Sequence, residues 1–415
     1  MPSTLPLDAP QASRDAATVA RPARAVPWYT AAALVSSTCV VVGLLWDVSW
    51  HRTVGRDTFW TLPHLLEQLA AVLAGLGCGW LVLTTTFAGA SSVVARQASV
   101  RVWGFRAPLG AWVCIWGTLV MLTSAPFDDW WHRAYGLDVK ILSPPHAVLA
   151  LGMISLQFGA LLLALAAHNR SASGDARMTG LLYAFAAGLI TTVIATLVME
   201  HAGFPNHMHS SRFYKVSGAV FPFVLVAIAR AAKLRWGATA TALVYMAMVA
   251  AMVWILPLFP AQSKLAPVYN PATHMIPPPF PLLLVAPALV IDALTRRVGR
   301  GHDWRLACLL GVTFVVVMLV VHWFWAEFML SPAARNPVFG ADQWDYSARL
   351  GAWRYQYWNL DGGAAGTFKW GRAGDVTDTL RWALLIRGLG VATVVAIVSS
   401  RLGLWWGNWM CTVKR

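Results

Sequence analysis

Residues 146–167 read HAVLALGMISLQFGALLLALAA, a stretch without any Asp, Glu, Lys or Arg. A helix of this kind is long and apolar enough to cross a bilayer, which takes about 20 residues. Similar stretches recur along the 415-residue chain, in which 58% of the residues are hydrophobic and only 12% are charged. Soluble domains carry about 25% charged residues. The composition therefore predicts an all-α polytopic membrane protein.

The other apolar runs and the charges between them predict the topology. We predict ten transmembrane helices, near residues 28–48, 63–85, 107–126, 146–167, 179–200, 214–232, 238–259, 279–295, 306–326 and 380–402. Lys and Arg concentrate before the first span and in every second loop after it. Because such loops stay in the cytoplasm, both termini are expected there, in a bacterial-type inner (plasma) membrane. The formal net charge of +14 then reflects topology and indicates no nucleic-acid partner.

Three regions are distinguished by composition. Residues 1–26 are rich in Ala, Pro and Arg without an apolar core, which predicts a disordered cytoplasmic tail. Residues 27–405 form the transmembrane domain in the lipid bilayer, and residues 406–415 a second cytoplasmic tail. The long outer loop 328–379 is rich in Trp and Tyr. That composition suits short helices lying on the membrane or a docking surface for partner subunits.

A segment containing Asp and His occurs twice, each time between two predicted spans. Residues 46–64 read WDVSWHRTVGRDTFWTLPH, and residues 127–146 read FDDWWHRAYGLDVKILSPPH. With one inserted residue, the copies align an Asp, a His four residues later, a Gly and a closing Pro-His pair. The sequence therefore predicts an internal repeat, in which spans 1 and 2 correspond to spans 3 and 4.

Each copy contains the side chains of a metal site. Asp47 and His51 are at positions i and i+4, so they share one helix face. The chain returns at Pro63, a favoured first residue of a helix, so His64 opens the next helix beside them. Carboxylate and imidazole groups are ligands of divalent transition metals. The predicted metal ligands are Asp47, His51 and His64 in the first copy and Asp128, His132 and His146 in the second.

Other polar residues are expected at the same outer level of the membrane. Of the 11 histidines, only His168 and His302 fall on the cytoplasmic side. The copies also differ: Leu149 stands in the second copy where the first has an acid, and Asp129 is an acid that the first copy lacks. The secondary candidates for metal binding are Glu67, Glu200, His201, His207 and His209.

The first copy resembles a known copper site. The spacing Asp47-x3-His51-x12-His64 is similar to the D-x3-H-x12-H motif in the C subunit of the copper membrane monooxygenases, the particulate methane and ammonia monooxygenases. In that family the Asp and both His bind copper within membrane helices near the outer face. The resemblance implies the same role for these three residues. It covers residues 46–64 only, and the second copy has one more residue between its histidines.

The sequence leaves several functions open. The first is a redox metalloenzyme or a subunit of one, monooxygenase-like, acting on O2, a quinol or a small apolar molecule from the lipid. The second is a protein that handles or inserts copper or zinc, and the third a metal-dependent lipid-carrier glycosyltransferase. A structural polar network without metal would use the same residues. The number of histidines favours the first function, with copper, or alternatively zinc or iron, over magnesium or calcium.

Overall fold

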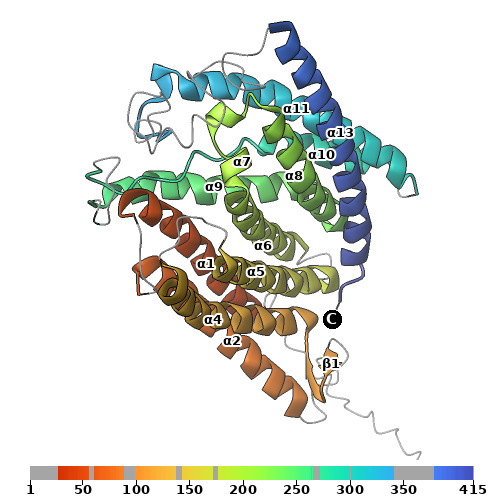
Figure 1. The fold of residues 1–415 in the computed structure, drawn as a ribbon. Helices are drawn as coiled ribbons and strands as arrows, with labels where there is room; N and C mark the ends of the chain where they lie inside the picture. Colours follow the sequence, from red (N-terminus) through yellow and green to blue (C-terminus); the bar gives the residue numbers. More distant parts are fainter. Residues whose placement is uncertain are drawn as a thin grey trace, which may run out of the picture.

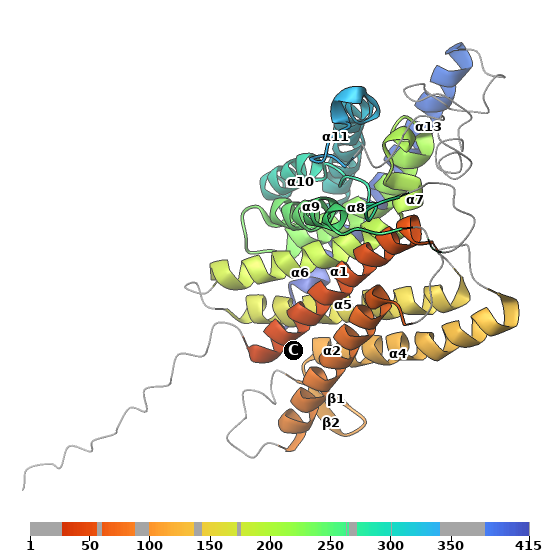
Figure 2. The ribbon, with the colours of Figure 1, turned by 90° about the vertical axis from the view of Figure 1, so that its left-hand side faces the viewer.

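The apolar stretches of the sequence form long helices in the computed structural model, and the fold is that of an all-α polytopic membrane protein (Figure 1, Figure 2). The structure describes residues 27–55, 60–87, 99–136, 143–171, 176–262, 264, 272–299, 301–340 and 378–414. The predicted tail 1–26 and most of the Trp- and Tyr-rich loop, residues 341–377, lie outside these ranges.

Within the described residues, nine helices are long and apolar enough to cross a membrane. They are α1 (Trp28–Thr53), α2 (Leu62–Phe87), α4 (Leu109–Tyr135), α5 (Pro144–Arg170), α6 (Ala176–Leu197), α8 (Ser211–Ala231), α9 (Gly237–Ile255), α11 (Asp303–Leu330) and α13 (Asp378–Met410). The shorter elements are the hairpin β1 (Val100–Val102) and β2 (Phe105–Ala107), the helices α7 (Met199–Ala202) and α10 (Val285–Arg297), and the 3-10 turns Pro205–His207, Leu256–Leu258 and Pro332–Ala334.

The four helices of the predicted repeat, α1, α2, α4 and α5, pack as a cluster in the lower part of Figure 1. Hydrogen bonds join the two helix pairs. The Thr118 hydroxyl of α4 donates to the Ala71 carbonyl of α2 over 2.9 Å. The Gln157 amide of α5 donates to the Ser37 carbonyl of α1 over 2.9 Å, and the Ser37 hydroxyl donates back to Gln157. Because a buried polar group in lipid is costly without a partner, these bonds fix the pairs relative to each other.

Glycines let α4 and α5 approach until their backbones touch. A Cβ atom on Gly117 would lie 2.5 Å from the backbone nitrogen of Leu156, and one on Gly159 would lie 2.6 Å from that of Cys114. Small residues of this kind drive helix packing in membranes, where lipid is as apolar as the side chains. Helices α4 and α5 are therefore packed tightly against each other.

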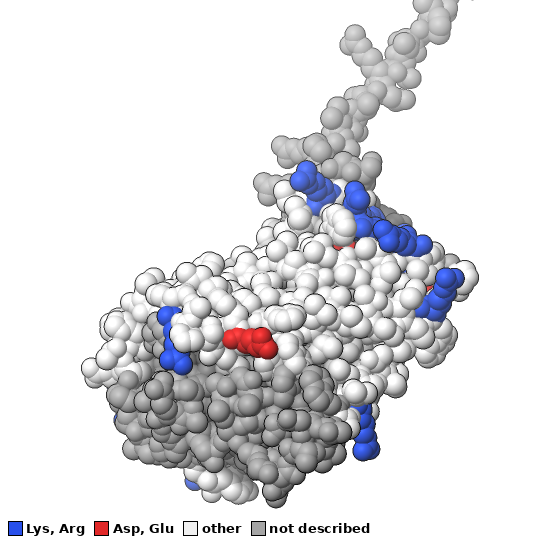
Figure 3. All heavy atoms as spheres, turned by 90° about the horizontal axis from the view of Figure 1, so that it is seen from above, with Lys and Arg blue, Asp and Glu red and all other residues white. Residues whose placement is uncertain are grey.

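The remaining helices form the other half of the molecule. Here α8 packs against α13, α11 against α13, and α6 against α9, while α6 also contacts α5 and so joins the halves. Large buried side chains fill the interior, among them Phe213, Phe221 and Phe314. Figure 3 shows a broad face of the molecule with few charged residues, as expected of a surface that faces lipid.

The span predicted near 279–295 is not a continuous helix. Residues 275–284, MIPPPFPLLL, form no helix, and α10 begins only after them. Proline has no N–H to donate and disfavours the interior of a helix. Single prolines are tolerated within α4 and α8, but this segment contains four, which a hydropathy pattern does not reveal. The segment nevertheless follows the full length of α9, because Met275 bonds the Phe259 carbonyl at one end and Asp292 accepts from Thr239 at the other. Nine of the ten predicted spans are therefore helices long and apolar enough to cross a membrane among the described residues, and a tenth crossing by this segment and α10 stays a prediction.

Side chains of three other helices satisfy this non-helical backbone. The bonds run from Ile276 N–H to Thr53 Oγ1 (2.8 Å), from Leu282 N–H to Tyr245 Oη (3.0 Å) and from Leu283 N–H to His322 Nε2 (3.2 Å). Irregular backbone is tolerated at membrane depth only where protein buries it in this way. The partners come from α1, α9 and α11, so this segment ties the two halves together.

The basic ends of the helices gather at one end of the molecule. Arg170 donates to the Lys414 carbonyl, Lys233 donates to the His168 carbonyl over 3.0 Å, and Arg230 pairs with Asp303 over 2.9 Å. These contacts join the ends of α5, α8 and α13 to the start of α11. Helix α13 continues to Met410, into the segment 406–415 that we predicted to be a tail. The cytoplasmic location of this end stays a prediction.

Candidate metal centre

The repeat places its polar residues where the end of one helix lies beside the start of the next. The first helix of each pair ends at a glycine in the left-handed region, Gly55 with φ 100° and Gly136 with φ 85°, a conformation that glycine adopts without strain. Proline lies in the first turn of the following helix in both copies. In the second copy the Ser143 side chain also caps the helix by accepting from the His146 N–H. The local sequence thus brings the end of one helix beside the start of the next.

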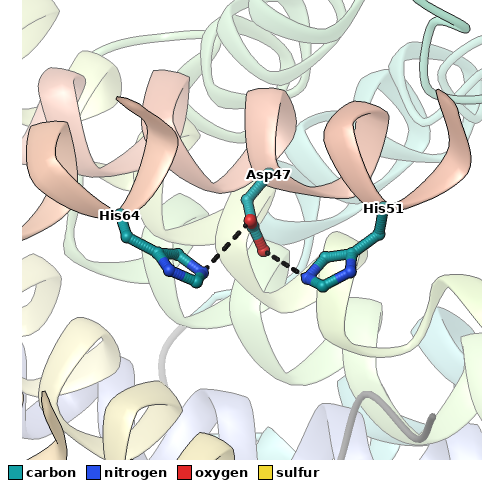
Figure 4. A group of neighbouring side chains, drawn as sticks. All are labelled: Asp47, His51 and His64. Atoms are coloured by element: carbon teal, nitrogen blue, oxygen red, sulfur yellow. Dashed lines mark ion pairs between the residues drawn. The ribbon is translucent and has the colours of Figure 1, made fainter. Parts of the chain in front are cut away.

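Asp47, His51 and His64 meet at the junction of α1 and α2 (Figure 4). His51 Nε2 lies 3.6 Å from Asp47 Oδ2, and His64 Nε2 lies 3.2 Å from Asp47 Oδ1. The two imidazoles therefore approach the carboxylate from opposite sides, one on each oxygen. One ligand atom from each of the three residues lies within 4.8 Å of the others. Among the described residues, no other group of three such side chains is as compact.

The geometry of this triad suits a metal ion. Transition-metal bonds to His and Asp are about 2.0–2.2 Å long, so ligand atoms of one ion lie at most about 4.4 Å apart. A side-chain movement of an ångström or so would close the observed spacing. Within the described residues, the buried Oδ1 atom of Asp47 also makes no hydrogen bond of good geometry. A carboxylate with one imidazole nitrogen beside each of its oxygens offers the ligand types that transition metals bind.

The second copy repeats the arrangement on α4 and α5. His132 Nε2 lies 3.3 Å from Asp128 Oδ2, and His146 Nε2 lies 3.6 Å from Asp128 Oδ1. The other ring nitrogen of His132 lies 3.3 Å from the Gly136 carbonyl. Such an outer bond orients a metal-ligating imidazole. The extra acid Asp129 is half exposed and pairs with Arg133 over 2.7 Å, away from this group.

Two cavities, a larger and a smaller one, adjoin the triads. One of about 100 Å³ is lined by the whole first triad and by apolar side chains such as Val48, Met153 and Met199. Arg52 lines it as well, is only 8% exposed and lies over the Phe204 ring at 5.5 Å. We did not identify Arg52 as a site residue from the sequence. The sequence could have indicated it, because an Arg directly follows the first His in both copies of the repeat.

The secondary candidates fall into two groups. Glu67 is 1% exposed and lines both cavities. Glu200 and His201 are exposed on α7, whereas His207 and His209 are buried in the following turn. His209 Nε2 lies 3.1 Å from the Trp323 carbonyl of α11, and burial lowers the pKa of its imidazole. In the part of the chain that the structure describes, these four residues do not join the triad.

Together, the fold and this site define a polytopic membrane protein with an Asp/His/His group that can bind a metal. No protein-family model, curated protein or solved structure matches the chain.

Proposed function

We propose that the protein holds a transition metal, copper in the first place, at Asp47, His51 and His64 and uses it for redox chemistry at the outer membrane face. The observation that carries the proposal is the compact triad, whose ligand atoms lie within 4.8 Å of one another. The resemblance of its spacing to the copper site of the membrane monooxygenases supports copper.

The ligand set favours a transition metal over a hard cation. Magnesium and calcium prefer sites made of oxygen ligands alone, whereas two imidazoles and a carboxylate suit copper, zinc or iron. Three protein ligands leave at least one coordination position open. Copper bound there would supply one-electron and O2 chemistry. The protein itself would position the ligands and exclude water.

The adjoining cavity indicates what could reach the site. Its apolar wall and its position between membrane helices suit a small apolar molecule or a quinol that arrives from the lipid. Arg52 places a positive charge in the same wall, where it would stabilise negative charge that develops during a reaction. A monooxygenase-like subunit is the function that these features support best.

Elemental analysis of the detergent-purified protein tests the proposal. We expect a transition metal in the wild type and the loss of one equivalent in His51→Ala, because this variant removes one of the three ligands. His302→Ala is the matched control, since His302 lies at the other end of the molecule at the start of α11, and its metal content should not change. A wild type that purifies without metal and binds none on titration would reduce the triad to a structural polar network.

A further inference from the structure

The two triads open onto one shared space. A second cavity, of about 20 Å³, is lined by His64 of the first triad and by Asp128 and His146 of the second. His146 also lines the larger cavity, together with Asp47. Each triad therefore presents a histidine to the space beside the other. A volume of about 10–15 Å³ suffices for one water molecule, so the gap between the triads accommodates a single small bridging group.

Glu67 stands at this junction. It lines both cavities and is 1% exposed. A buried carboxylate between membrane helices is costly and usually functional. The repeat places Leu149 at the matching position of the second copy, and Leu149 lines the same two cavities. The cavities beside the two ligand sets thus contain one additional acid, Glu67, which comes from the first copy of the repeat only.

The helix opposite leaves room for this acid. A Cβ atom on Gly43 of α1 would lie 2.6 Å from Glu67 Cγ, closer than real Cβ atoms come to their neighbours. The alignment that pairs Asp47 with Asp128 pairs Gly43 with Ser124, so the second copy has a side chain at this position. The absence of a side chain at Gly43 is therefore specific to the copy that carries the acid.

We propose that Asp128, His132 and His146 hold a second transition-metal ion and that Glu67 lies between the two ions as a shared carboxylate ligand. The proposal rests on the function proposed above and turns the repeat into one paired metal centre. Two divalent ions bring four positive charges, of which Asp47 and Asp128 balance two. Glu67 supplies a third negative charge at the place where the ions face each other, and so lessens their repulsion.

Titration with Cu²⁺ tests the paired centre. Cu²⁺ is a suitable probe because imidazole and carboxylate sites bind it more tightly than other divalent first-row metals, and it is paramagnetic. The full-length protein, stripped by a chelator, should bind two equivalents, and electron paramagnetic resonance should show magnetic coupling between them. His51→Ala and His132→Ala should each retain one equivalent with an uncoupled signal, while His302→Ala should behave as the wild type.

Two further variants test Glu67 without removing a triad residue. Glu67→Gln keeps the size of the side chain and removes its charge. Gly43→Ala keeps every ligand but places a methyl group against the Glu67 side chain. Both should bind the second equivalent at least tenfold more weakly and lose the coupling. Circular dichroism and gel filtration would verify that each variant is folded.

The outcomes separate the two proposals. If the wild type binds one equivalent that His51→Ala abolishes and His132→Ala retains, the function proposed above stands and the paired centre is wrong. If two equivalents bind but their coupling is unchanged in Glu67→Gln and Gly43→Ala, Glu67 is not the shared ligand. If no Cu²⁺ binds at all, both proposals fail.

Discussion

A single carboxylate lies between two imidazoles in each copy of the repeat. Asp47 and Asp128 each use both oxygens, one for a histidine of the same helix and one for a histidine of the next. The possible ligand atoms of each group therefore already lie near one another. Such preorganisation lowers the cost of binding, because fewer side chains must be ordered at that moment.

His209 should make stability depend on pH. It is 2% exposed, and burial lowers its pKa, although the Trp323 carbonyl and the charge of Glu327 oppose the shift. The folded protein thus favours the neutral ring, whereas the unfolded chain protonates near pH 6.5. Stability from this residue is present above that pH and declines as the pH falls below it. Thermal melting from pH 7.5 to 5 should show a smaller decline in His209→Gln, and equal declines would contradict the prediction.

The Tyr245 hydroxyl group should stabilise the non-helical segment 275–284. That hydroxyl accepts the Leu282 N–H over 3.0 Å, and Tyr245→Phe would leave a buried donor without this partner. An unsatisfied buried group costs about 1–3 kcal/mol, so the unfolding midpoint should fall. Tyr135→Phe, at an exposed position, is the control and should melt as the wild type. A Tyr245→Phe variant that melts with the control would argue against this role.

Helix packing gives a prediction for the pair α4 and α5. Gly117→Ala would place a Cβ atom 2.5 Å from the Leu156 backbone, and the two helices would have to separate. Overpacking of this kind costs about 1–3 kcal/mol. Gly79→Ala in α2 is the matched control, since its Cβ atom would meet nothing within 4 Å. Thermal unfolding in detergent should show a loss for Gly117→Ala alone, and equal midpoints would refute the close approach.

The helices differ in how far the sequence predicts them. The placement of Asp47 and His51 on one face of α1 and of His64 at the start of α2 follows from the i, i+4 spacing and from Pro63, because local rules govern it. The non-helical segment 275–284 does not, since its apolar composition satisfies a hydropathy window whatever its hydrogen bonds are. Its prolines were the available signal. Nothing in the sequence around Gly43 indicated its role, because that role depends on a side chain of another helix.

At the scale of the whole molecule, both ends of the described chain lie at the basic end. Tyr29 near the start of α1 belongs to the same packed cluster as Met410 and Val413. The predicted ten crossings, an even number, would have this result, and the positive-inside rule predicts that the common side is cytoplasmic. Reporter fusions at the two termini should therefore give the same cytoplasmic signal. An outward reporter at either end would reject the topology.

The proximity of the two triads could not be predicted from the sequence. The repeat predicts two similar helix pairs but not how they face each other, which depends on contacts far apart in the chain. Gln157 bonds Ser37 and Thr118 bonds Ala71, and these contacts bring the pairs into one cluster. The sequence therefore predicted the residues of each triad, and the fold alone reveals the space between them.

The non-helical segment also bears on the order in which the chain is assembled. When residues 275–284 are synthesised, Thr53 and Tyr245 already exist, but His322, the partner of Leu283, lies on a helix that has not yet been made. Until α11 has been synthesised, the Leu283 N–H group must then donate its hydrogen bond to water. We expect this segment and α11 to enter the bilayer as one unit. In a chain ending before α11, a cysteine introduced at Leu283 should stay reactive to a water-soluble thiol reagent, and full protection there would contradict this order.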